Sequence, residues 1–104
     1  MTIEQIRALC TDDQIELSGH MLLRMTQRHI SYIEIKEVIM RGEIIEDYPD
    51  DYPYPSCLIF GYTVKNRVIH TVVGVGDSKL WLITAYEPDP KQWSTDFRFR
   101  KEHP

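Results

Sequence analysis

Residues 30–35, Ile-Ser-Tyr-Ile-Glu-Ile, mark the boundary between two predicted helices and decide how the first half of the chain folds. Ser31 and Glu34 have the spacing of a capping box, in which each side chain hydrogen-bonds the backbone N–H of the other residue. Ile30 and Ile35 stand at the two positions of a hydrophobic staple. One helix therefore ends before this box, and the next begins inside it.

The second of these helices is predicted to run from Tyr32 to about Arg41. Ile35, Val38 and Ile39 recur at the spacing of a buried helical stripe. Gly42 follows, and glycine at this position is typical of a helix that ends in the left-handed conformation. We therefore expect the helical part of the chain to comprise residues 1–42.

Two further elements are expected upstream of the boundary. Thr2–Cys10 reads as a short helix with one narrow apolar edge. Gln14–Ser18 alternates polar and apolar residues, which suits a short strand or an extended lead-in. Ser18 is of a residue type that caps helices, so the helix before the boundary should begin directly after it.

After residue 42 the pattern becomes extended. Four segments rich in β-branched and aromatic residues predict strands: Glu43–Tyr48, Cys57–Val64, Val68–Val75 and Leu80–Tyr86. Short polar turns should join the last three as successive hairpins, and three prolines make the loop before them stiff. Residues 97–100, Phe-Arg-Phe-Arg, alternate, which predicts both rings toward the sheet and both guanidinium groups in solvent.

These elements predict one α+β domain over residues 1–104. The N-terminal helices would pack on one face of an antiparallel meander of four to five strands, formed by residues 43–100. A hydrophobic content of 42% with 27% charged residues is typical of a folded globular chain. Because no stretch approaches the roughly 18 apolar residues of a membrane span and no signal peptide is evident, we expect a soluble cytoplasmic protein.

The charge is unevenly distributed along the chain. The formal net charge of -4 argues against binding to nucleic acid, which rests on clustered Lys and Arg. However, Glu43–Tyr52 alone holds five acidic residues and no base, so 11 of the 16 acids remain elsewhere against 12 Lys and Arg. A local basic surface is therefore compatible with the composition.

The sharpest chemical signal lies between Ser18 and Ser31. On a helix, His20, Arg24 and Arg28 fall at i, i+4 and i+8 and share one polar stripe, whereas Met21, Leu22 and Met25 lie on another face. This combines an acid–base candidate with two permanent cations. A solvated basic helix face would show the same pattern.

The strands carry two more candidates, His70 and Tyr86. His70 shares one side of its strand with Val68, Val72 and Gly74; Tyr86 shares one side of its strand with Leu80, Leu82 and Thr84. If both look out from the face without helices, they add two titratable groups to a site. The simpler interpretation is a hydrogen-bonded core histidine and an aromatic residue of the sheet.

Other chemistries lack their motifs. The sequence has no GxGxxG before a helix, no P-loop and no HExxH, and its four histidines are scattered. Cys10 and Cys57 show neither a metal-ligand spacing nor a nucleophile's context. We therefore predict no cofactor and no metal.

The whole ordering resembles the bacterial domain-of-unknown-function family 4258. The residues that carry the resemblance are Ser-Gly-His20, Arg24, Gln-Arg28-His-Ile-Ser31, Gly42-Glu-Ile-Ile-Glu46-Asp-Tyr-Pro49, Tyr-Pro-Ser56-Cys-Leu-Ile, Ile-His70, and Leu-Ile-Thr84-Ala-Tyr86-Glu-Pro-Asp89 with Trp93. The family is similar to RelE-like and MqsR-like toxin ribonucleases of the barnase/EndoU/RelE group. The resemblance thus implies a toxin endoribonuclease, active without metal, with RNA as substrate, ribosome-bound mRNA included, and an antitoxin protein as partner.

Roles follow from that implication. Metal-independent RNA cleavage needs a base, an acid and cations that stabilise the charge on the phosphorane. His20 and His70 would serve as base and acid in either order, and Arg24 and Arg28 would bind the scissile phosphate. Tyr86 would assist positioning or proton transfer. Flanking phosphates would lie on Lys91, Arg98 and Arg100, and Trp93 would offer a stacking platform.

A second hypothesis belongs to another class. The domain would be a non-catalytic module that binds a basic partner through the acidic Tyr-Pro loop and the outer sheet face. Tyr48, Tyr52 and Tyr54 support this hypothesis, because tyrosine is enriched at protein interfaces. The two hypotheses are compatible, since a toxin also binds its antitoxin.

Overall fold

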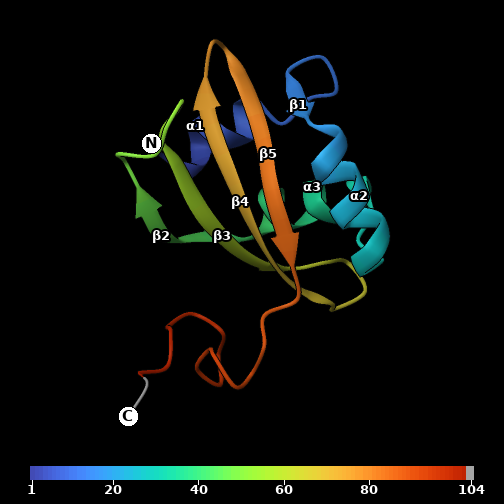
Figure 1. The fold of residues 1–104 in the computed structure, drawn as a ribbon, viewed down its shortest axis with the longest axis vertical. Coiled ribbons are helices and arrows are strands. Elements are labelled where there is room, and N and C mark those ends of the chain that lie inside the picture. Colours follow the sequence, from blue (N-terminus) through green and yellow to red (C-terminus); the bar gives the residue numbers. More distant parts are fainter. Residues whose placement is uncertain (103–104) are drawn as a thin grey trace.

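The computed structural model describes residues 1–102 and contains three helices and one five-stranded sheet (Figure 1). The helices are α1 (Ile3–Ala8), α2 (Gly19–Arg28) and α3 (Tyr32–Arg41). Capping boxes begin α1 and α3, and the predicted box of Ser31 and Glu34 is present in full. No helix in the described part of the chain is long and apolar enough to cross a membrane.

The strands are β1 (Ile15–Leu17), β2 (Glu43–Tyr48), β3 (Ser56–Tyr62), β4 (Val68–Gly76) and β5 (Lys79–Tyr86). They lie in the order β1-β5-β4-β3-β2, and β2 to β5 form the predicted antiparallel meander. The α+β prediction is confirmed, but the sheet is mixed because β1 runs parallel to β5. Two strands so distant in sequence are not joined by a hairpin, so nothing forces them to be antiparallel.

The helices cover one face of the sheet and enclose the main apolar core. Met21 and Met25 of α2 and Ile35, Val38 and Ile39 of α3 pack there against Ile59, Ile69 and Val73 of the sheet. In Figure 1 the helices lie behind and to one side of the strands. We call the opposite side the outer face.

Gly42 differs from its prediction. Its backbone is extended, with φ of -94°, and not left-handed. A Cβ at this position would lie 2.3 Å from the Phe60 carbonyl oxygen and 2.6 Å from that of Val38. Glycine is therefore needed because α3 leaves its last turn directly against the backbone of β3, not because of a positive φ.

The prediction that Leu80, Leu82, Thr84 and Tyr86 share one side is wrong. The register between β4 and β5 shifts once, so Val73 pairs with Leu82 but Val72 pairs with Thr84. The bulge at Ile83 reverses the alternation. Leu80 and Leu82 consequently join the helix-side core, whereas Thr84 and Tyr86 lie on the outer face with Val72 and His70.

Residues 88–102, the tail, continue past the end of β5 (Figure 1), and Trp93 and Phe97 of the tail contact His70 on the outer face. The predicted placement of residues 97–100 is wrong for Phe99, whereas the side chains of Arg98 and Arg100 are 41% and 61% exposed. Phe99 is 68% exposed, and the guanidinium groups of Arg98 and Arg100 lie 4.7 Å from the centroids of the Phe60 and Trp93 rings. The segment is a turn in which Phe97 has a φ of 63°, so strand alternation does not apply.

Candidate active site at the end of strand β5

The polar stripe of α2 is exposed as expected. Ser18 caps the helix by accepting a hydrogen bond from the Met21 N–H at 3.1 Å. His20, Arg24 and Arg28 are all exposed, while Met21 and Met25 are buried in the core. Leu22 does not follow them, because it is 51% exposed.

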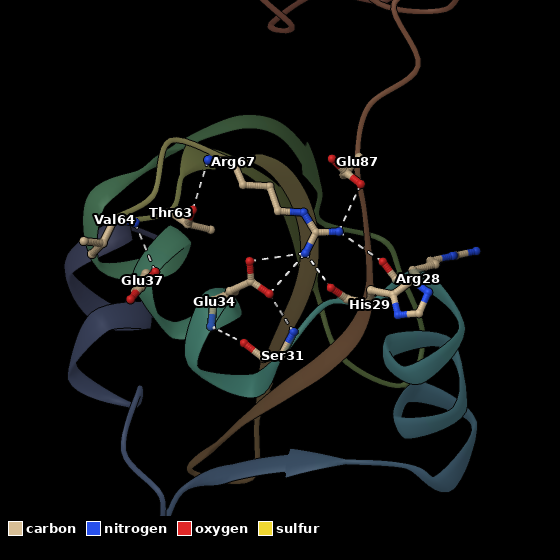
Figure 2. A network of polar contacts seen from close by, with 9 residues as sticks. All are labelled: Arg28, His29, Ser31, Glu34, Glu37, Thr63, Val64, Arg67 and Glu87. Atoms are coloured by element: carbon tan, nitrogen blue, oxygen red, sulfur yellow. Dashed lines mark hydrogen bonds and ion pairs between the residues drawn. The ribbon is translucent and has the colours of Figure 1, made fainter.

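The C-terminal end of α2 is held by Arg67, a residue that the sequence did not single out (Figure 2). Its guanidinium group donates to the backbone carbonyls of Arg28 and His29, to the Glu34 carboxylate of the capping box and to Glu87. Only 23% of its side chain is exposed. Its acidic partners are far away in sequence, so no local spacing signals this contact.

Arg28 reaches from the last turn of α2 to the edge of β5. One nitrogen of its guanidinium group donates to the Ala85 carbonyl at 2.9 Å and to Thr84 Oγ1 at 3.3 Å. None of the ion pairs within residues 1–102 involves Arg28. Its charge is therefore held in place by neutral acceptors and is not neutralised.

His70 and Tyr86 stand opposite each other on β4 and β5 and face outward. His70 Nδ1 lies 3.4 Å from the Tyr86 hydroxyl, and His70 Nε2 lies 2.8 Å from the Phe97 carbonyl oxygen. A carbonyl only accepts, so Nε2 carries the proton and Nδ1 is free to accept one from Tyr86. In the contact between the two side chains, the Tyr86 hydroxyl is therefore the donor and His70 Nδ1 the acceptor.

The tail encloses this pair on the outer side. His70 is fully buried, and its ring packs edge-on against the Trp93 indole at 4.4 Å between centroids. Burial lowers the pKa of His70 below its usual 6.5, although the Phe97 carbonyl and Glu46 oppose this. Burial raises the pKa of Tyr86, and the nearby positive charges of Arg100 and Arg28 act against that rise.

Two arginines of the tail are paired with acids of β2. Arg98 binds Glu43, and Arg100 makes hydrogen bonds of 3.0 and 3.2 Å to Glu46. Burial would raise the pKa of Glu46, but hydrogen bonds from Arg100 and Tyr48 bring it below the usual 4.5. Part of the acidic stretch noted in the sequence therefore neutralises two of the predicted phosphate ligands.

The structure does not bring all predicted site residues together. His20 lies in the first turn of α2, two turns before Arg28, at an axial separation of about 12 Å. It lines a separate groove with Tyr54 and Trp81. Within residues 1–102 the side chain of Arg24 hydrogen-bonds only Gln27, and Lys91 is exposed. Arg28, His70, Tyr86 and Trp93 form the compact group.

In chemical terms this group offers one unpaired cation and one neutral imidazole–phenol pair. The described residues hold no cluster of three or more His, Cys, Asp or Glu side chains that could bind a metal ion. Anion binding and proton transfer are what the arrangement can do.

The family model "Domain of unknown function (DUF4258)" matches residues 17–87. The chain belongs to this family. The match confirms the resemblance seen in the sequence and spans α2, His70 and Tyr86, while the tail lies outside the matched segment. The relation of DUF4258 to RelE-like and MqsR-like ribonucleases stays a prediction. Neither curated proteins nor solved structures gave a match.

Proposed function

We propose that this DUF4258 protein is a metal-independent endoribonuclease, acting as the toxin of a toxin–antitoxin pair, with its active site where α2 meets the end of β5. One juxtaposition supports the proposal. The unneutralised Arg28 guanidinium lies on Thr84 and Ala85, directly before Tyr86, whose hydroxyl faces His70 Nδ1. A fixed cation beside a proton-transfer pair meets the needs of phosphodiester cleavage.

Arg28 would bind the scissile phosphate. Its guanidinium group has five donors, and its bonds to Thr84 and Ala85 use only one of its nitrogens. The remaining donors are free to bind two phosphate oxygens, which gain negative charge in the phosphorane. Arg24, one turn earlier on the same exposed stripe, would bind a neighbouring phosphate.

Tyr86 and His70 would move the proton. The Tyr86 oxygen takes the proton of the ribose 2′-hydroxyl as its own proton passes to His70 Nδ1. The 2′-oxygen then forms a bond to phosphorus and the bond to the 5′-oxygen breaks. The proton returns from His70 through Tyr86 to the 5′-oxygen, leaving a 2′,3′-cyclic phosphate and a 5′-hydroxyl.

The environment of His70 suits this role. A low pKa keeps the imidazole neutral at pH 7, and only the neutral ring accepts a proton at Nδ1. Tyr86 is half-buried and so remains accessible to substrate, while His70 acts through it. For Trp93, Arg98 and Arg100 to meet RNA as predicted, the tail would have to leave the sheet.

The test is cleavage of RNA by Tyr86→Phe, which removes only the hydroxyl. We expect wild-type protein to cleave free or ribosome-bound RNA in the presence of EDTA and to leave a cyclic phosphate end. Tyr86→Phe should be slower by about 10²- to 10⁴-fold. The matched control is Tyr62→Phe, a tyrosine of β3 that is 41% exposed, which should cleave at the wild-type rate.

Three further outcomes decide the proposal. The absence of cleavage and of growth arrest on expression of the wild-type protein would refute it. If His20→Ala loses as much activity as Tyr86→Phe, the acid–base role predicted for His20 holds despite its position in the separate groove. If His20→Ala cleaves normally, proton transfer belongs to Tyr86 and His70.

A further inference from the structure

A second concave surface lies at the opposite end of β5 from Tyr86. It is a groove of about 480 Å³ between the loop of residues 49–55, the start of α2 and strands β1 and β5. Tyr52, Tyr54 and Trp81 supply its aromatic lining, and Leu17, Leu82 and Ile83 supply its aliphatic lining. We call it the Tyr-Pro groove. It goes beyond the proposed ribonuclease site, because neither Arg28 nor Tyr86 lines it.

Two of the rings are held rigidly. Trp81 and Tyr54 stack with their centroids 5.5 Å apart and an angle of 23° between the rings. The indole nitrogen of Trp81 donates to the Gly76 carbonyl at 3.0 Å. Tyr54 lies so close to Gly76 that a Cβ there would come within 1.9 Å of its ring. The aromatic wall is therefore preformed and has little conformational entropy to lose on binding.

The third ring is unpacked. Tyr52 is 95% exposed, although it lines the same groove. A large aromatic side chain left in solvent beside an aromatic wall is a feature of binding surfaces. Tyr52 is thus free to close over an occupant that lies on Trp81.

The charge around the groove selects the occupant. Asp51 lines it and Asp50 precedes Asp51, and neither forms an ion pair within residues 1–102. Lys79, which flanks Trp81 in β5, is paired with Glu16. Carboxylates without cationic partners repel phosphates and attract ammonium or guanidinium groups, which also bind the faces of Tyr and Trp rings.

We infer that the Tyr-Pro groove docks a basic segment of a partner protein. An arginine or lysine side chain of that segment lies on the rings of Tyr52 and Trp81, with its charge toward Asp50 and Asp51. Apolar neighbours of that residue contact Leu17 and Ile83. The partner therefore binds beside the proposed catalytic group without using its residues.

The groove can be tested with a synthetic peptide of alternating arginine and leucine. The chain has two tryptophans, Trp81 in the groove and Trp93 in the tail, so their indole N–H signals in NMR spectra report on the two regions separately. We expect the peptide to shift the Trp81 signal and to leave that of Trp93 in place. The same peptide with citrulline in place of arginine keeps the shape, lacks the charge and should bind weakly.

Tyr52→Ala is the matching variant, since an exposed side chain can be removed without disturbing the core. We expect its peptide dissociation constant to rise by about threefold to thirtyfold, the range of a cation–π contact. Tyr62→Ala, an exposed tyrosine remote from the groove, should bind as wild type does. Asp50→Lys should weaken binding further in low salt.

Several results would overturn the inference. These are equal binding of the citrulline peptide, a peptide-induced shift of Trp93 alone, or no binding at millimolar peptide. A shift of Trp81 by a single-stranded RNA oligonucleotide, with none by the peptide, would assign the groove to nucleic acid. Since the assay involves no cleavage, it tests the docking inference independently of the ribonuclease proposal.

Discussion

The two faces of the sheet are covered by different kinds of contact. On the helix side, apolar side chains of all three helices form one buried cluster with the strands. On the outer face, the tail is held by the buried Trp93 indole packed on His70, by ion pairs from Arg98 and Arg100, and by the hydrogen bond between His70 and the Phe97 carbonyl. The helix side is thus held mainly by apolar packing, whereas the contacts of the tail on the outer face also depend on charge and protonation.

The largest expected effect breaks the helix side. Ile39→Ala removes a fully buried side chain of α3 and should lower the free energy of unfolding by about 2–5 kcal/mol. Met40→Ala, at the neighbouring position that is 50% exposed, should change it by less than about 0.5 kcal/mol. Denaturation in urea measures both, and equal effects would mean that α3 does not pack as described.

The outer face should make the stability of the folded chain depend on pH near neutrality. His70 has a lowered pKa in the folded chain and titrates near 6.5 when unfolded. Above that pH the imidazole is neutral in both the folded and the unfolded chain, and its contribution to stability is fully present. As pH falls below 6.5, the unfolded chain binds a proton that the folded chain does not, so stability decreases.

Melting temperatures between about pH 7 and 5 test this expectation. His70→Gln should flatten the profile, whereas His20→Gln, which alters an exposed imidazole, should keep the slope. Glu46 contributes in a separate and lower range, because its pKa lies below 4.5. A slope that survives in His70→Gln would contradict the buried neutral ring.

The smallest effect concerns the ion pairs of the tail. Arg100→Gln removes the pair with Glu46, and exposed pairs of this kind contribute about 0.2–1 kcal/mol. High salt should lower the resistance of the wild-type tail to proteolysis toward that of the variant, and it should leave the resistance of the variant unchanged. Lys91→Gln, an exposed tail position, is the control, and proteolysis of the tail is the measurement.

Much of the fold was readable from local patterns. The capping box, the buried stripe of α3 and the alternating strands are short-range features, so their spacing in the sequence reports them directly. The bulge at Ile83 and the need for glycine at position 42 arise from contacts with other strands, and periodicity alone does not reveal such contacts.

The candidate site was readable only in part. The exposure of His20, Arg24 and Arg28 follows from helical spacing. The meeting of Arg28 with Thr84 and the hold of Arg67 on the end of α2 join residues far apart in the chain. The tail was the weakest prediction, because a turn at Phe97 replaces the expected alternation.

The hydrogen bond from Arg28 to Ala85 also bears on self-association. β1 pairs with β5 only at residues 80–82, so within the described chain no strand flanks the last part of that edge. An open strand edge is a template on which a second molecule can add its own strand. Arg28 occupies the Ala85 carbonyl and puts a charge at this edge, which discourages such pairing. Substitution of Arg28 should therefore be followed by light scattering as well as by activity, and Arg28→Lys, which keeps the charge, should aggregate less than Arg28→Ala.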